Sequence, residues 1–358
     1  MTTTTTTGRR RRASLAAAAL TGVTLLALAA CSTPAPQVTP PPVTLGPTIT
    51  PEKSAAPTPE VPPTWPLTGV EGQTVERPSL AVKIENTVIA RPQSGLDEAD
   101  VVWETIVEFE VSRFIAVFHS KVPDEVGPIR SVRPMDPVIL APTQGMLAFS
   151  GGQPGILRLA SNSGLQILSH DAGAPGMYRI STRAAPHNVY GSPETFWEQA
   201  DADHSDSPPE QFAFARSADR ATAVVQGEAA KTLAFRLSAA SSPSWTWDGE
   251  HWLRSEGSTP ATDQDGDRLQ AVNVVSITAP HPDSGFDAQG GAPVPTYDLV
   301  GEGKGVIATG GKTTAVTWKK ESEDAPLLLF KGGKPALLAP GNTWVELVPK
   351  GSGSLSIS

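Results

Sequence analysis

Cysteine is the scarcest residue type in this chain of 358 residues, with Cys31 as the single example. A chain with one thiol cannot form an intrachain disulfide, so its core has to be stable through packing alone. A cysteine nucleophile needs a partner histidine in a folded pocket, and the apolar, Pro- and Thr-rich surroundings of Cys31 supply neither. The scarcity therefore excludes a disulfide scaffold and disfavours cysteine catalysis.

Positive charge is also in short supply. The chain has 28 Lys and Arg against 37 Asp and Glu, which gives a net charge of -9. That balance provides no basic surface for nucleic acid, and it argues against binding of anionic lipid headgroups by the folded surface. We therefore predict no nucleic-acid partner.

Motifs for metal and serine chemistry are absent as well. The six histidines show no H-x-x-x-H or H-E-x-x-H spacing, and no G-x-S-x-G occurs. Residues 263–267 (DQDGD) resemble an incomplete calcium loop. Arg268 stands where that turn needs glycine, and Val274 stands where a bidentate Glu belongs, so a surface hairpin is the favoured interpretation. No metal and no cofactor is predicted.

The N-terminus has the pattern of a bacterial export signal. Arg9 to Arg12 form a positive n-region, and residues 13–30 form an apolar, alanine-rich h-region. Leu28-Ala29-Ala30-Cys31 then resembles a lipobox, in which the cysteine becomes the lipidated first residue of the mature chain. We predict a signal peptide over residues 1–31 and lipidation of Cys31. Residues 11–15 loosely resemble a twin-arginine signal, so Sec and Tat export both stay open, and the length of the apolar segment leaves a retained transmembrane anchor as the alternative.

Residues 32–66 are rich in Pro, Thr and Ala and carry few charges. Such a composition cannot bury enough apolar surface to fold, and its prolines favour polyproline II. At about 3.1 Å per residue, the extended segment reaches up to ~100 Å. We predict a disordered tether that holds the rest of the chain at the extracytoplasmic face of the cell membrane.

The remaining residues, roughly 290, exceed one average domain. Over residues 67–205 short apolar runs alternate with helical signals, which predicts an α/β (α+β) N-terminal domain. Its expected strands and helices include Leu80–Ile84, Val101–Val107, Arg113–Ser120, Met146–Ser150, Pro154–Ala160 and a helix capped by Ser192. Over residues 206–358 β-rich runs are separated by turn pairs such as Asp248-Gly249 and Gly310-Gly311. This pattern predicts a smaller all-β C-terminal domain, a sandwich or a partly open barrel.

Closely spaced Arg and acidic residues gather between residues 79 and 136, and a polar His-Asn pair follows later. Guanidinium groups bind carboxylates or phosphates in a bidentate way, and a nearby histidine titrates near neutrality. These residues predict a polar cleft for an anionic or sugar-like ligand, formed by Arg91, Glu104, Glu108, Arg113, Arg130, Arg133, His187 and Asn188. A buried ion-pair network that fixes loops around the sheet is the alternative, because spacing along the chain does not establish that these residues meet.

The carboxylates of Glu104 and Glu108 also allow a catalytic hypothesis. The two residues are predicted neighbours either along a strand or at i, i+4 on a helix. Two carboxylates at glycosidase-like separation, one of them in an apolar setting, can act as general acid and base. A cell-wall glycoside hydrolase is therefore the alternative function. Solvent-open, unpaired carboxylates in a cleft favour the enzyme, whereas burial of each against an Arg favours a binding or structural role.

Several long motifs occur in order along the chain after the tether. They include residues 91–96 (RPQSGL), 127–134 (GPIRSVRP), 185–190 (APHNVY) and 340–344 (PGNTW). In these segments the chain resembles the YerB-like bacterial lipoproteins, a family named from sequence without an established activity. The resemblance implies a family-type N-terminal domain and a smaller C-terminal β domain, and it leaves the function open.

Together these patterns predict an exported protein anchored to the membrane by a lipid on Cys31. We expect a non-catalytic binding or scaffolding protein whose partner is an envelope polymer or an envelope protein, with the polar cleft of the first domain as its site. A purely structural adaptor without a cleft is the third interpretation.

Overall fold

A computed structural model describes residues 62–358, and these residues belong to one compact unit. The predicted signal peptide, Cys31 and the tether as far as residue 61 lie outside the described residues. The last residues of the predicted tether are folded: Thr64 forms a β-bridge with Glu71, and the ring of Trp65 packs edge-on against His119. Across residues 62–358, no helix combines the length and the apolar character needed to cross a membrane.

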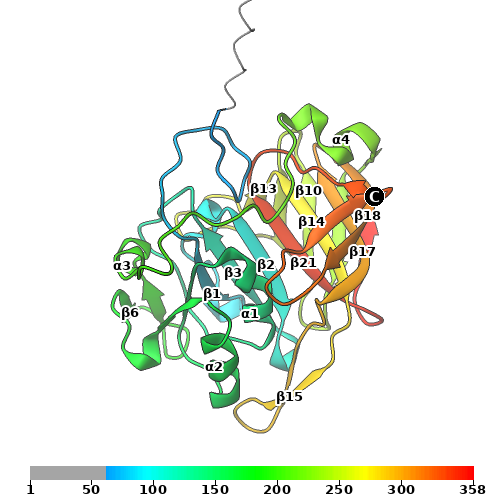
Figure 1. The fold of residues 1–358 in the computed structure, drawn as a ribbon. Helices are drawn as coiled ribbons and strands as arrows, with labels where there is room; N and C mark the ends of the chain where they lie inside the picture. Colours follow the sequence, from blue (N-terminus) through cyan, green and yellow to red (C-terminus); the bar gives the residue numbers. More distant parts are fainter. Residues whose placement is uncertain (1–61) are drawn as a thin grey trace, which may run out of the picture. The chain divides into compact units, whose positions relative to one another are not determined.

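One large sheet runs through the compact unit, and within residues 62–358 it has twelve strands. In spatial order these are β20 (Lys334–Pro335), β19 (Leu328–Lys331), β18 (Lys312–Lys320), β17 (Gly301–Thr309), β14 (Asn273–Ala279), β21 (Thr343–Pro349), β2 (Val101–Ile106), β3 (Ser112–Phe118), β1 (Leu80–Glu85), β4 (Met146–Phe149) and β5 (Gln166–Ser169), with β8 (Glu228–Ala229) paired to β18. The strand β21 lies parallel beside β2, so strands from early and late parts of the chain join in one sheet (Figure 1).

A second, smaller sheet covers one face of the large sheet. Its strands are β12 (Thr259–Pro260), β11 (Trp252–Glu256), β10 (Pro243–Trp247), β9 (Thr232–Arg236) and β22 (Ser354–Ile357), with β13 (Gln270–Ala271) paired to β11. Trp245 of β10 and Trp252 of β11 are fully buried, and Trp245 packs edge-on against Trp344 of β21. The two sheets therefore enclose one apolar layer, as in a β-sandwich.

Helices and a hairpin cover the opposite face of the large sheet. They are α1 (Met135–Leu140), α2 (Pro154–Ser161) and the hairpin of β15 (Asp283–Asp287) and β16 (Pro293–Pro295). Gln153 caps α2, because its side chain accepts a hydrogen bond from the Gly155 amide, and Pro154 occupies the first turn. Ile156 and Ala160 of α2 face the sheet and are buried. Figure 1 shows α1 in front of the central strands, with α2 and the β15 hairpin below it.

The remaining elements lie at the edges. They are the hairpin of β6 (Met177–Arg179) and β7 (Val189–Gly191), the helices α3 (Pro193–Trp197) and α4 (Thr222–Gln226), and the short 3-10 turns η1 (Val88–Ala90), η2 (Leu96–Glu98), η3 (Glu108–Glu110), η4 (Ala141–Thr143), η5 (His170–Ala172) and η6 (Ala218–Arg220).

The central strands are buried on both faces. All six residues of β1 and all six of β2 are buried, and alternate side chains enter opposite layers. Polar side chains on these strands, such as Lys83 and Glu104, are therefore buried together with the apolar ones. Burial of charge at these positions requires ion-pair partners from other elements.

The predicted sheet-rich architecture is confirmed in its coarse form. The helices α1 to α3 fall within residues 67–205, and the later part of the chain is mainly strand with the short helix α4. Strands of both parts pair with one another through β2 and β21. The division of the chain between residues 205 and 206 stays a prediction.

Candidate functional site

A buried ion-pair cluster, hereafter the Arg254 cluster, lies between the two sheets. The Arg254 guanidinium donates from Nη2 to Oε2 of Glu104 at 2.6 Å and from Nη1 to Oε1 of Glu346 at 2.8 Å. All three side chains are fully buried. Three aromatic rings lie about the guanidinium carbon, with centroids at 5.1 Å (Phe114), 5.4 Å (Trp245) and 5.0 Å (Trp344).

The two carboxyl groups of this cluster differ in protonation. Burial opposes ionisation of Glu104, but the charge and hydrogen bonds of Arg254 hold the pKa of Glu104 below its ordinary value. Burial raises the pKa of Glu346 well above its ordinary value, and the charge of Glu104 raises it further. Within this pair a proton is therefore held more strongly by Glu346 than by Glu104. Glu256 balances the remaining charge, since its carboxylate binds Arg254 at 2.8 Å and Arg91 at 3.0 Å.

A second cluster lies on the opposite face of the large sheet and is centred on Glu108. The Glu108 carboxylate accepts hydrogen bonds from Nε and Nη2 of Arg133 and from Nη2 of Arg113, the last at 3.0 Å. Burial alone would raise the pKa of Glu108, but these two arginines lower it to about 2. Burial, with the neighbouring Arg133 charge, lowers the pKa of Arg113 to about 9. Glu108 is thus a permanent anion within a closed ion-pair network at physiological pH.

A third group sits at the carboxyl end of β1. Glu85 accepts from His187 Nδ1 at 2.8 Å, and Arg130 Nε lies 3.4 Å from the same carboxylate. The side chains of Arg130 and His187 are about one-fifth exposed. Asn188 belongs to the β6–β7 hairpin instead, where its side-chain oxygen accepts from Arg179 at 2.7 Å.

The eight residues predicted from sequence therefore do not meet in one hollow. Arg91 and Glu104 join the Arg254 cluster, whereas Glu108, Arg113 and Arg133 lie on the other face of the sheet. The expected proximity of Glu104 and Glu108 is wrong because β2 ends at Ile106 and the 3-10 turn η3 starts at Glu108, which breaks the strand alternation. Each carboxylate is buried against an Arg, which is the arrangement we expected for a binding or structural role rather than for a hydrolase.

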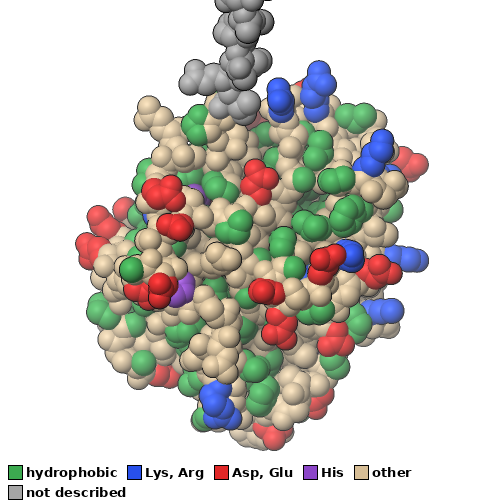
Figure 2. Space-filling model, viewed as in Figure 1, with side chains coloured by type: hydrophobic (Ala, Val, Ile, Leu, Met, Phe, Trp, Pro, Cys, Tyr) green, Lys and Arg blue, Asp and Glu red, His purple; other side chains and the backbone are tan. Residues whose placement is uncertain are grey.

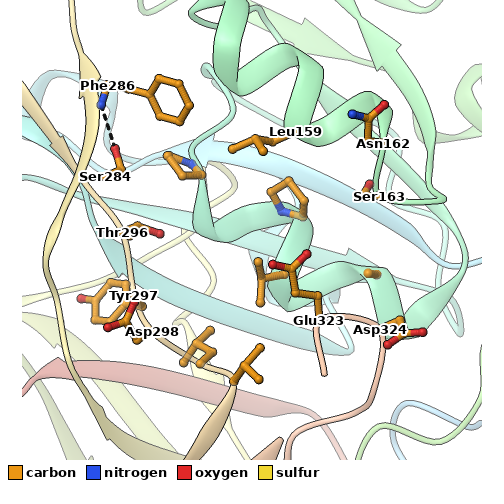
Figure 3. A pocket seen from close by; sticks show the side chains of 16 residues that line it. Leu159, Asn162, Ser163, Ser284, Phe286, Thr296, Tyr297, Asp298, Glu323 and Asp324 are labelled. Atoms are coloured by element: carbon orange, nitrogen blue, oxygen red, sulfur yellow. Dashed lines mark hydrogen bonds between the residues drawn. The ribbon is translucent and has the colours of Figure 1, made fainter. Parts of the chain in front are cut away.

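A hollow of about 840 Å³, hereafter the seam hollow, lies between α1, α2 and late segments of the chain. Figure 3 shows side chains of α2, of β15 and of the segments 296–298 and 323–324 around this space. Its lining consists of Pro134, Pro137, Val138, Ala141, Leu159, Asn162, Ser163, Ser284, Phe286, Thr296, Tyr297, Asp298, Leu299, Val300, Glu323 and Asp324. Its volume lies in the range of small-molecule and peptide-side-chain pockets.

The carboxyl end of β2 positions two walls of the seam hollow. The Ile106 amide donates to the Tyr297 hydroxyl at 3.3 Å, and that hydroxyl donates to the Leu347 carbonyl at 3.0 Å. Two residues beyond Ile106, Glu108 binds Arg133, which directly precedes the lining residue Pro134. Hydrogen bonds thus hold the Tyr297 wall to β2 and β21, and the Glu108–Arg133 ion pair holds the chain directly before Pro134.

A buried lysine fixes α1 itself. Lys83 Nζ donates to Asp136 Oδ1 at 2.7 Å, and the other oxygen of Asp136 accepts from the Arg133 amide at 2.7 Å. Burial lowers the pKa of Lys83 to about 8, although the Asp136 charge opposes this shift. The first turn of α1 is therefore held to β1 by a charged pair that is fully buried.

The seam hollow combines apolar walls with carboxylates. Asp298, Glu323 and Asp324 line it, and none of its lining residues is Lys or Arg. Figure 2 shows acidic side chains across this face, with Lys and Arg mostly toward its rim. Among residues 62–358, no group of three or more His, Cys, Asp and Glu side chains is arranged to hold a metal ion.

The chain matches a known protein family over both parts of the large sheet. Residues 67–206 match the N-terminal domain of DUF3048, described as a protein of unknown function, and residues 233–345 match its C-terminal domain. The chain belongs to the DUF3048 family. The seam hollow is lined by residues of both DUF3048 domains.

YerB of Bacillus subtilis matches this chain in sequence and in structure, which confirms the predicted resemblance to the YerB-like lipoproteins. The protein named "Putative lipoprotein YerB" of strain 168 is 27% identical over 304 residues, which cover 79% of this chain and 86% of that protein. The crystal structure of YerB protein from Bacillus subtilis superimposes with a TM-score of 0.69 at 25% identity and covers 82% of this chain and 99% of that chain. The name of this relative describes it as a lipoprotein.

Arg254 and Glu346, which complete the Arg254 cluster, were not singled out from the sequence, and neither were the residues that line the seam hollow. Arg254 lies two residues after the buried Trp252 on β11, and Glu346 lies two residues after Trp344 on β21. That phase was a usable signal, because residues two apart on a strand share a face. The seam hollow offers no comparable signal, since its lining comes from several segments that are distant in sequence.

Proposed function

We propose that this DUF3048 protein is a non-catalytic binding protein of the bacterial envelope. A lipid on Cys31 holds it at the extracytoplasmic face of the cell membrane, and its partner is an envelope polymer or an envelope protein. The seam hollow is the proposed site. The observation that carries the proposal is that this hollow is built by both DUF3048 domains. Beside it, Glu108, Arg113 and Arg133 are occupied in internal ion pairs.

The arginine-rich motif has a positioning role in this proposal. Arg133 and Arg113 bind Glu108, and Arg133 leads directly into the α1 wall of the hollow. Pre-organised walls improve binding because they reduce the entropy that is lost when a ligand is held. Within the family motif at residues 127–134, Pro134 lines the hollow, and Arg133 supports that wall from behind.

Membrane crosslinking with the full-length lipoprotein tests the proposal. The variant Leu159→Trp/Val300→Trp fills the hollow from two exposed positions, with 42% and 49% exposure, so its fold should be preserved. Val75→Trp/Val225→Trp is the matched control at exposed apolar positions outside the lining. We expect the wild type and the control to recover the same crosslinked envelope component, and the hollow-filling variant to recover at least about tenfold less, which corresponds to about 1.4 kcal/mol.

Equal recovery of that component with the hollow-filling variant would contradict the site. The anchor is tested separately by labelling with a fatty-acid probe, which should mark the wild type and not Cys31→Ala. Equal labelling of Cys31→Ala, or no labelling of the wild type, would contradict lipid anchoring without touching the proposed site.

A further inference from the structure

We infer that the seam hollow binds a basic peptide segment, in which a Lys or Arg side chain is flanked by apolar side chains. The inference rests on the proposed function and specifies the chemistry of its ligand. The ligand is a peptide segment of a partner protein.

Charge complementarity is the first argument. The side chains of Asp298 and Glu323 have no hydrogen-bond or ion-pair partner within residues 62–358, and Asp324 accepts a hydrogen bond from Ser322 alone. All three carboxylates are exposed at the hollow, and no lysine or arginine lines it. A cation placed among them gains attraction without breaking an existing ion pair.

The carboxyl end of α2 adds to the negative electrostatic potential of the hollow. Leu159, Asn162 and Ser163 at the carboxyl end of this eight-residue helix line the hollow. The carbonyl end of a helix carries partial negative charge, which favours a cation over an anion at this wall. The helix end and the carboxylates therefore select the same sign of charge from two different walls.

Apolar surface is the second argument. Leu159 and Val300 are among the exposed large apolar side chains of the described part of the chain, and both line the hollow with Phe286 beside them. Exposed apolar groups gathered at one concave site indicate a binding surface. A ligand that is only charged would leave this surface in water, so the cation must be attached to an apolar body.

Size and polar groups favour a peptide over a small amine. A hollow of about 840 Å³ is near the upper end of the range for drug-sized ligands. The Asn162 side chain makes no hydrogen bond within residues 62–358 and is exposed at the rim, where its amide can pair with a peptide backbone. A chain of several residues covers both the apolar wall and the carboxylates, whereas a single amine reaches one of them.

Binding of defined probes to the full-length lipoprotein in neutral detergent tests this inference. The probe is a labelled, capped tetrapeptide Leu-Lys-Lys-Leu, compared with Leu-Glu-Glu-Leu and with n-hexylamine as a competitor. The test variant is Asp298→Asn/Glu323→Gln/Asp324→Asn. The control, Asp219→Asn/Glu228→Gln/Glu250→Gln, removes three exposed charges outside the lining. We expect the basic peptide to bind about tenfold more weakly to the test variant and unchanged to the control, because exposed ion pairs contribute modestly and add up over three sites.

The inference would be overturned if the wild type bound the acidic peptide as tightly as the basic one. It would also be overturned if the test variant bound the basic peptide as tightly as the wild type does. Displacement of the peptide by n-hexylamine at equal concentration would identify a small amine as the ligand and overturn the peptide assignment. The crosslinking assay separates the two proposals. If the envelope component is lost with Leu159→Trp/Val300→Trp but retained with the triple amide variant, the proposed function stands and the basic-peptide inference fails.

Discussion

Glu104 and Glu346 are directly opposed across the parallel strands β2 and β21, and one guanidinium, that of Arg254, binds both. The pair joins β2, which lies in the N-terminal DUF3048 match, to β21, which begins in the C-terminal match. Two adjacent carboxyl groups in a buried site resist being ionised at the same time, because their negative charges repel each other. The opposite pKa shifts of Glu104 and Glu346 fit one shared proton, and the Arg254 guanidinium ties both carboxyl groups together between the two sheets.

Unequal effects are expected from amide substitutions in this pair. Glu104→Gln removes the anion that balances buried Arg254, and breaking such a pair costs about 3–5 kcal/mol. Glu346→Gln replaces a neutral acid by a neutral isostere and should cost about 1 kcal/mol or less. Urea unfolding at pH 7 measures both free energies. Equal losses would show that the proton is not held by Glu346.

The Lys83–Asp136 pair is predicted to act as a unit. Lys83→Met leaves the Asp136 carboxylate buried without its cation, so we expect a loss of about 3–5 kcal/mol of unfolding free energy. The double variant Lys83→Met/Asp136→Asn keeps an acceptor for the Arg133 amide and leaves no charge unpaired. It should therefore be more stable than the single variant. A double variant that is the less stable of the two would contradict the pairing.

His119 is predicted to make the protein sensitive to mild acid. Burial, together with the Arg77 charge, lowers the pKa of His119 to about 4 from an ordinary value of 6.5. Between these values the unfolded chain binds more protons than the folded one, so stability falls as the pH decreases from about 6.5 to about 4. His119→Phe should flatten the unfolding free energy over this window. His251→Phe, at a half-exposed position, is the control and should keep the wild-type slope.

Glu108 predicts a second acid window at lower pH. Its pKa in the folded protein is about 2, against an ordinary 4.5, so its stabilising contribution is complete above about 4.5 and is lost as the pH falls toward 2. Glu108→Gln should destabilise the protein at pH 7 and remove the pH dependence of this window. Thermal unfolding of the wild type and of Glu108→Gln between pH 2 and 7 would measure this change. If stability depends on pH equally in both proteins, the Arg113 and Arg133 contacts of Glu108 do not persist in solution.

Arginine geometry matters at the same cluster. Arg133 binds both oxygens of Glu108, and a lysine cannot reproduce that two-pronged contact. We expect Arg133→Lys to cost about 1–3 kcal/mol and to weaken capture of the envelope component at the seam hollow, because the α1 wall loses its support. Arg158→Lys on the exposed side of α2 is the control, and equal behaviour of the two variants would argue against a positioning role for Arg133.

Local elements followed from local pattern. The predicted strand Leu80–Ile84 is β1 to within one residue, and Pro154–Ala160 is α2 to within one residue. Ser192 caps its helix as expected, since its side chain accepts from the Thr195 amide at 3.4 Å. Alternation, capping residues and proline positions act over a few residues, so they can be recognised without knowledge of the rest of the chain.

The tertiary structure alone decided which charges are neighbours. Strand pairing of β2 with β21 places Glu104 beside Glu346, and the turn after Ile106 directs Glu108 to the other face. The sequence by itself determined the lipobox-like N-terminus, the short strands and helices, and the family. It did not determine the Arg254 cluster or the seam hollow, because pairing between distant strands depends on the whole core and carries no local signal.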